Sequence, residues 1–178
     1  MVARPESISQ LGDLGSGDTD EVLVVEKMHD HILIRPALPS ERRTLEALQR
    51  RASLSNPGDR EALLANPDAI NLPVVQIDAG LVFVLEAAGS IKGFAAILDR
   101  EDGNADLDAL FVEPDTWRQG FGRSLVDYCA TTAHGRGSAV LHVVGNPHAE
   151  RFYTGCGFEL VGTADTRFGI GLLMRRSL

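Results

Sequence analysis

The residues most able to do chemistry lie where an apolar segment meets two closely spaced glycines. An expected strand at 105–112 runs into a turn that contains Gly120 and Gly122, and helix-forming residues follow from Ser124. A helix N-terminus presents unpaired backbone N–H groups and the positive end of the helix dipole, and both favour an anion. Glycine also lets a phosphate approach the backbone, because no Cβ is in the way. The segment therefore predicts a phosphate-bearing ligand just beyond the end of a strand.

Two common phosphate-binding motifs are excluded by the residues around this turn. No Gly-Lys-Ser or Gly-Lys-Thr closes it, so it is not a P-loop. The dinucleotide fingerprint needs a third glycine at position 125, where this chain has Leu125. An unrelated nucleotide-binding domain is therefore disfavoured. Taken alone, a Gly-x-Gly is also compatible with an ordinary tight turn.

A second segment, 139–158, carries further spacing that could build a site. A short apolar strand at 139–144 precedes Asn146, which suits a helix N-cap, and Pro147, which suits the first helical position. The i, i+3, i+4 spacing then places three residues on one helical face, namely Ala149, Phe152 and Tyr153.

Together these two segments resemble the GNAT superfamily of N-acetyltransferases. The strand, Gly-x-Gly turn and helix resemble its acyl-CoA signature, and 139–158 resembles the strand-and-helix motif that follows, in the same order and at a similar separation. The resemblance extends more loosely from residue 31 to the end. It implies an α/β fold with a mixed, mostly antiparallel sheet flanked by helices. It also implies acetyl transfer from acetyl-CoA to a primary amine of a small-molecule or peptide acceptor.

The resemblance implies which residues would contact the cofactor. In the family, the end of the strand pairs with the pantetheine arm, and the glycine turn wraps the pyrophosphate. Transferred to this chain, the cofactor contacts are Leu110, Phe111, Val112, Arg118, Gln119, Gly120, Phe121, Gly122, Arg123, Ser124, Asn146 and Arg151.

One departure from the family pattern concerns the residue three positions before the first glycine. The family usually has Arg or Gln there, and this chain has Trp117, with Arg118 and Gln119 beside it as substitute polar groups. Because backbone amides carry most of the pyrophosphate contacts, we expect weaker affinity at worst. The departure keeps open an alternative, a catalytically silent acyl-CoA-binding module with a regulatory role, against which Tyr153 argues.

The resemblance implies a proton donor and a base. Tyr153 matches the family tyrosine that protonates the CoA sulfur, and a phenol with a pKa of ~10 carries its proton at neutral pH. The base would be a carboxylate on the strand at 105–112. Asp106 is the closer match and Asp108 the competitor, and alternation places both on one face with Leu110 and Val112. The plainer interpretation of Tyr153 is a core aromatic residue, and that of Asp106 and Asp108 is a solvated strand face. His142 is a third candidate base.

The acceptor is not identified by any local pattern. Arg50, Arg51, Asn56 and Arg60 could bind an acidic group of the acceptor, although a solvated helix face is the preferred interpretation.

Composition places the chain among single-domain proteins without a nucleic-acid or membrane partner. Its 178 residues suffice for one core, and 44% are hydrophobic. Residues 1–30 carry −5 of the net charge of −8, so the remainder is nearly balanced and has no basic face. No window has the ~18 apolar residues of a membrane span. The two cysteines form no disulfide framework and no metal-binding spacing, so no metal is expected. The N-terminus lacks an apolar signal core, which favours a cytoplasmic protein. A homodimer is expected only because dimers are the commonest symmetric oligomers.

The element pattern divides the chain into an acidic, partly flexible segment at 1–30 and a domain at 31–178. A Val-Leu-Val-Val run within 21–26 could add an edge strand. Ser40 suits the N-cap of the first helix. Strands are predicted at 31–35, 81–86, 91–98, 105–112, 139–144, 159–163 and 169–175, and helices at 41–53, 59–65, from 124 and after Asn146.

Overall fold

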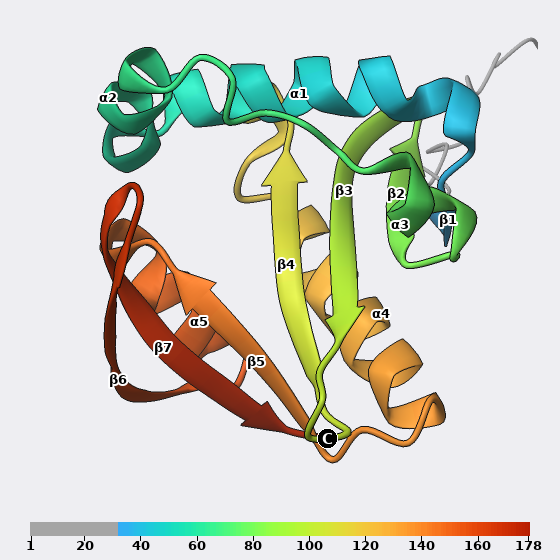
Figure 1. Cartoon of the computed structure of the whole chain (residues 1–178). Coiled ribbons are helices and arrows are strands. Elements are labelled where there is room, and N and C mark those ends of the chain that lie inside the picture. Colours follow the sequence, from blue (N-terminus) through green and yellow to red (C-terminus); the bar gives the residue numbers. More distant parts are fainter. Residues whose placement is uncertain (1–31) are drawn as a thin grey trace, which may run out of the picture.

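The described residues form one mixed sheet with helices on both faces (Figure 1). The computed structural model describes residues 32–178, so the acidic segment 1–30 and its predicted edge strand lie outside the described residues. The seven strands follow the order β1-β2-β3-β4-β5-β7-β6. They are β1 (Leu33–Pro36), β2 (Val82–Ala87), β3 (Ser90–Asp99), β4 (Ala105–Val112), β5 (Val140–Gly145), β6 (Glu159–Thr166) and β7 (Gly169–Ser177). Only β4 and β5 run parallel, so the predicted mixed, mostly antiparallel architecture is confirmed.

The helices divide between the two faces of this sheet. Those of the first half are α1 (Arg42–Ser55), α2 (Pro57–Ala65) and α3 (Val74–Asp78), and those of the second half are α4 (Phe121–Gly135) and α5 (Glu150–Gly155). Short 3₁₀ turns precede α1, α4 and α5, at Pro39–Glu41, Pro114–Thr116 and Pro147–Ala149. The sequence did not predict α3, which is only five residues long.

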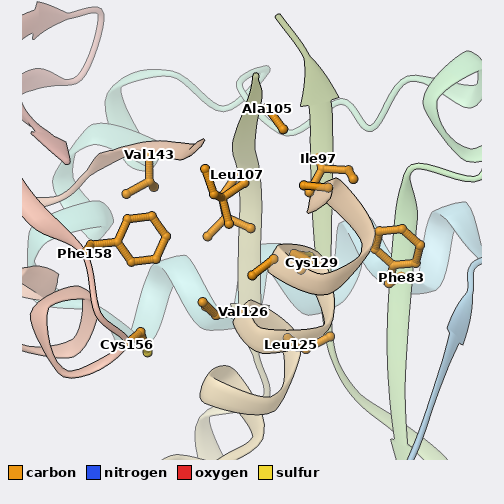
Figure 2. Packing of buried hydrophobic residues seen from close by; sticks show 14 of the residues in the cluster. Phe83, Ile97, Ala105, Leu107, Leu125, Val126, Cys129, Val143, Cys156 and Phe158 are labelled. Atoms are coloured by element: carbon orange, nitrogen blue, oxygen red, sulfur yellow. The ribbon is translucent and has the colours of Figure 1, made fainter. Parts of the chain in front are cut away.

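The larger core lies between α4 and the sheet. Buried residues recur along α4 at steps of one, three and four residues, so a single face of the helix is buried. Figure 2 shows Leu125, Val126 and Cys129 of this face in the same cluster as Leu107 of β4 and Phe158. Phe158 lies three residues beyond the end of α5, and Tyr153 of α5 packs against the same cluster, so α5 and α4 are anchored to the same side of the sheet.

The smaller core lies on the other face, under α1. Leu45 and Leu48 are fully buried there, beside an aromatic pair formed by Phe94 and Phe111 with ring centroids 5.5 Å apart. The prediction that Ser40 caps α1 was wrong. Ser40 lies inside the preceding 3₁₀ turn, and Glu41 is the N-cap residue of α1.

An irregularity in β4 breaks the alternation that the sequence suggested. Ala96 of β3 pairs with Ala109, whereas the next residue, Ile97, pairs with Leu107, so Asp108 is the extra residue of a bulge. Beyond the bulge, Leu110 packs against the α4 core, as Leu107 does before it. The prediction that Asp106 and Asp108 share a face with Leu110 and Val112 was therefore wrong.

The parallel neighbours β4 and β5 separate soon after they begin. They pair only through Ala105 with Leu141 and Asp106 with His142. From Leu107 onward the two strands diverge, and Figure 1 shows them as the arms of a V. The divergence leaves one backbone edge of β4 without a β5 partner, and this edge positions the site described next.

Candidate active site

A cavity of about 730 Å³ opens where β4 and β5 diverge. This volume is in the range of small-molecule and cofactor sites. Its walls come from α1, α2, β4, the turn before α4, α4, β5, the turn after β5 and α5. The lining residues include Leu107–Val112, Trp117, Arg118, Gly120–Arg123, Val143, Val144, Asn146 and Arg151–Tyr153. Segments that the sequence placed in one site are thus gathered around one cavity.

The glycine turn borders this cavity and begins α4. Gly120 is the N-cap residue with a φ of +89°, and Arg118 also has a positive φ, of +68°. No side chain caps the helix. The first amides of α4 therefore depend on solvent or a ligand for hydrogen bonds, and this turn is suited to an anion.

Gly120 allows a stability prediction, because a Cβ at this position would meet no atom within 4 Å. Alanine should cost only the backbone strain of a positive φ, about 1–2 kcal/mol, and should lower the Tm by several degrees. The matched control is Gly135→Ala in α4, where φ is not positive and space is also open, and there we expect equal or higher stability. Thermal unfolding checks both, and equal Tm values for the two variants would contradict the strained turn.

Trp117 has a structural contact at the entrance to the turn. Its indole Nε1 donates a hydrogen bond of 2.8 Å to the carbonyl oxygen of Val112 at the end of β4. The side chain lines the cavity and is 42% exposed. The residue that departs from the family pattern therefore ties the turn to the strand that precedes it.

Two side chains of the expected cofactor set do not line the cavity. Gln119 is exposed, and Ser124 Oγ donates to the carbonyl oxygen of Gly120 at 3.3 Å. The three arginines of the expected cofactor set, by contrast, border the cavity. Arg118, Arg123 and Arg151 all line the cavity, and Arg123 Nη2 also donates to the carbonyl oxygen of Gly155 at 2.5 Å, which ties α4 to the end of α5.

Tyr153 projects from α5 into the cavity and is held by aromatic packing. Its ring lies 5.2 Å from that of Phe152 and 5.6 Å from that of Phe158, both edge to face. A Cβ on Gly145 would come within 3.0 Å of the ring, so glycine there makes room for it. Burial raises the pKa of Tyr153 above its usual range, and the charge of Asp59 adds to this effect. The phenol therefore keeps its proton well above neutral pH.

The two candidate bases on β4 have different surroundings. Asp108 lines the cavity at the bulge and accepts a 3.2 Å hydrogen bond from Nε2 of Gln76, which is 5% exposed. Asp106 does not line the cavity, and its carboxylate is paired with Arg100 at 3.0 Å. His142 lies opposite Asp106 and does not line the cavity either.

Asn146 joins the end of β5 to α2. Its Oδ1 accepts from the backbone N–H of His148 at 2.9 Å, as predicted for an N-cap, here of a 3₁₀ turn. Its Nδ2 donates to Asp59 Oδ1 at 2.5 Å, and the other oxygen of Asp59 accepts from Asn56 at 2.9 Å. A Cβ on Gly58 would lie only 2.5 Å from the side chains of Asn146 and His148, so α2 approaches this turn closely.

Asp59 lines the cavity, and the sequence did not single it out. The sequence pointed instead to Arg50, Arg51, Asn56 and Arg60 for an acidic acceptor. Only Asn56 lines the cavity. The three arginines contact the carbonyl oxygen of Pro67, the carboxylate of Glu113 and the carbonyl oxygen of Leu54, respectively.

Two further features concern residues 32–178, namely their helices and their His, Cys, Asp and Glu side chains. None of the helices there has the length and apolar character that a membrane crossing requires. No three His, Cys, Asp or Glu side chains in that part of the chain are grouped so that they could hold a metal ion.

Comparison with known proteins agrees with the expected family. Residues 78–160 match the family model of the acetyltransferase (GNAT) domain, whereas no curated protein matches the chain. Among solved structures, PaiA N-acetyltransferase from Thermoplasma acidophilum, in complex with coenzyme A, is similar with a TM-score of 0.69 and 16% identity, over 83% of this chain and 99% of that one. YncA from Salmonella typhimurium, a putative acetyltransferase with acetyl-CoA, has a TM-score of 0.62 and 18% identity, over 83% and 94%. The family resemblance and the fold class expected from the sequence are confirmed.

Proposed function

We propose that this chain, which carries an acetyltransferase domain of the GNAT superfamily, moves an acetyl group from acetyl-CoA to a primary amine. The observation that carries the proposal is the cavity itself. The edge of β4 left free by β5, the glycine turn at the start of α4 and the Tyr153 phenol all border this one space. An extended thioester with an anionic end fits this arrangement, because each of its parts meets a complementary group.

We propose that the cofactor lies along β4 and ends at the glycine turn. The amides of the pantetheine arm would pair with the backbone of Leu110–Val112, as an added strand does. The pyrophosphate would accept from the amides of Gly120–Arg123. Arg118 and Arg151 would add charge-assisted contacts with phosphate groups. Gln119 and Ser124 would contact the cofactor through their backbone atoms only. Asn146 would lie beside the pantetheine arm.

The chemical step is then direct attack by the amine nitrogen on the thioester carbonyl. The new C–N bond forms, and the amine proton passes to the carboxylate of Asp108. The tetrahedral intermediate collapses, the C–S bond breaks, and the sulfur takes the proton of the Tyr153 hydroxyl. Asp108 is proposed over Asp106 because it lines the cavity and its hydrogen-bond partner is a neutral amide, whereas Asp106 is paired with Arg100 outside the cavity.

Gln76 is expected to hold Asp108 in place. Replacing it with methionine removes the donor but keeps a similar length, so kcat should fall about tenfold, as expected when a catalytic group loses its orientation. The KM for acetyl-CoA should stay within about twofold, because Gln76 does not line the cavity. Gln49→Met in α1 is the control for the same exchange outside the site. Equal kcat values in steady-state kinetics of the two variants would remove Gln76 from this role.

The experiment that tests the proposed function is calorimetric titration with acetyl-CoA, beside a titration with NADH, followed by an amine panel with detection of released thiol. We expect micromolar binding of acetyl-CoA, no response to NADH and thiol release that depends on an amine. Absence of acetyl-CoA binding would overturn the proposal. Binding without transfer to any amine would instead favour the second candidate, a silent acyl-CoA-binding regulatory module, which the Trp117 departure keeps open.

A further inference from the structure

The carboxylates that line the cavity have no arginine partner, unlike eight other carboxylates of the described residues. Within residues 32–178, eight carboxylates pair with an arginine, among them Asp106 with Arg100 and Glu113 with Arg51. Asp59 and Asp108 are the two acidic residues that line the cavity, and neither forms a salt bridge with another described residue. Their partners are neutral side-chain amides instead.

Asp59 is held in a fixed orientation by two neutral partners. Each of its oxygens accepts one amide N–H, from Asn146 at 2.5 Å and from Asn56 at 2.9 Å. A carboxylate has about four acceptor positions, so room remains on both oxygens for a further donor. A neutral amide orients a carboxylate but does not neutralise it, and the negative charge is therefore available to a ligand in the cavity.

The arginines that line the cavity come from other elements than the two carboxylates. Arg118 lies in the glycine turn, Arg123 in α4 and Arg151 in α5, where the phosphates of the proposed cofactor would be. Asp59 comes from α2 and Asp108 from the bulge of β4. Asp59 also lies near enough to Tyr153 for its charge to raise the pKa of that phenol. The carboxylates thus border the part of the cavity where the proposed transfer would occur.

We propose that the acceptor carries a second cationic group besides the reacting amine, and that Asp59 binds this second group while the reacting amine lies at Asp108. The inference rests on the proposed function and names its acceptor class, short diamines and related polycations. An ammonium group is the complement of an oriented carboxylate that has only neutral partners. An acidic acceptor would meet two uncompensated negative charges, and Arg50, Arg51 and Arg60 do not line the cavity to offset them.

The test compares acceptors of equal length and different charge, with the full-length chain at saturating acetyl-CoA. The diamines are 1,3-diaminopropane, 1,4-diaminobutane and 1,5-diaminopentane. The matched monoamines are propylamine, butylamine and pentylamine, and 4-aminobutanoate supplies an acidic acceptor. We expect kcat/KM to be about ten- to a hundredfold higher for the best diamine than for its monoamine, the scale of one charge-assisted hydrogen bond. The acidic acceptor should be the poorest.

Two variants assign this preference to Asp59. Asp59→Asn should lower the diamine-to-monoamine ratio of kcat/KM about ten- to a hundredfold. The control is Glu61→Gln, which removes the same charge from the same helix at an exposed residue that does not line the cavity, and the ratio should not change. The wild-type acceptor series stands by itself if Asp59→Asn does not fold.

The outcomes separate this inference from the proposed function. Transfer to monoamines or to 4-aminobutanoate at least as fast as to diamines would overturn the cationic acceptor and leave acetyl transfer intact. An equal loss for all acceptors in Asp59→Asn would mean that Asp59 only supports Asn146, which also overturns it. Binding of acetyl-CoA with no transfer to any of these amines would remove the proposed function, and the inference would fall with it.

Discussion

Replacing Tyr153 with phenylalanine is expected to lower kcat by about a hundredfold, the usual scale for loss of a general acid. The dissociation constant of acetyl-CoA should stay within about twofold, because the ring and its packing remain. Phenylalanine keeps the contacts with Gly145, Phe152 and Phe158, which involve only ring carbons. Among the described residues, no hydrogen bond holds the Tyr153 hydroxyl, so stability should change by less than about 0.5 kcal/mol. Steady-state kinetics and calorimetry on one preparation measure these quantities.

Tyr128 supplies the matched control, since it is the other of the two tyrosines in the chain. It lies in α4, packs edge to face on Phe83 at 5.1 Å and does not line the cavity, so Tyr128→Phe should leave kcat unchanged. The raised pKa of Tyr153 adds a pH test. Because the folded-state pKa lies above the ordinary value, the proton is retained, and wild-type kcat should show no loss from phenol ionisation up to about pH 10. Undiminished turnover in Tyr153→Phe would remove the residue from the mechanism.

The parts of the site that the sequence predicted depend on local signals. A strand, a turn with two glycines and a helix start follow one another within a short segment, so Gly120 and Gly122 could be placed from spacing alone. The same holds for Asn146, whose cap contact is with the backbone of His148. Tyr153 follows from helical spacing together with the family resemblance. The predictions at Gly120, Gly122 and Asn146 needed only the residues within a few positions.

The parts that the sequence could not predict depend on register or on distant contacts. The choice between Asp106 and Asp108 depends on the bulge, where β4 has one residue more than the paired segment of β3. A prediction from regular strand alternation cannot locate such a bulge. Asp59 meets Asn146 across 87 positions of sequence, so no local pattern marks it. Helix α3 was missed because five residues carry little periodicity, yet it supplies Gln76.

Asp108→Asn carries the second large expected effect and tests the choice of base directly. Asparagine keeps the shape and one acceptor oxygen but cannot take a proton, so kcat at pH 7 should fall about a hundredfold. Asp106→Asn is the comparison on the same strand. It removes an exposed ion pair with Arg100, worth at most ~1 kcal/mol of stability, and kcat should change by less than about twofold.

The pH dependence distinguishes a lost base from a disturbed fold. Without Asp108 the reaction must use acceptor that is already deprotonated, so the rate of the variant should rise about tenfold per pH unit below the acceptor pKa of ~10. The wild type should depend less steeply on pH, and the deficit of Asp108→Asn should shrink as the pH approaches 10. A deficit that is constant across pH would mean that the substitution perturbs structure rather than proton transfer. A larger loss in Asp106→Asn would reassign the base to Asp106, at the paired end of β4 and β5.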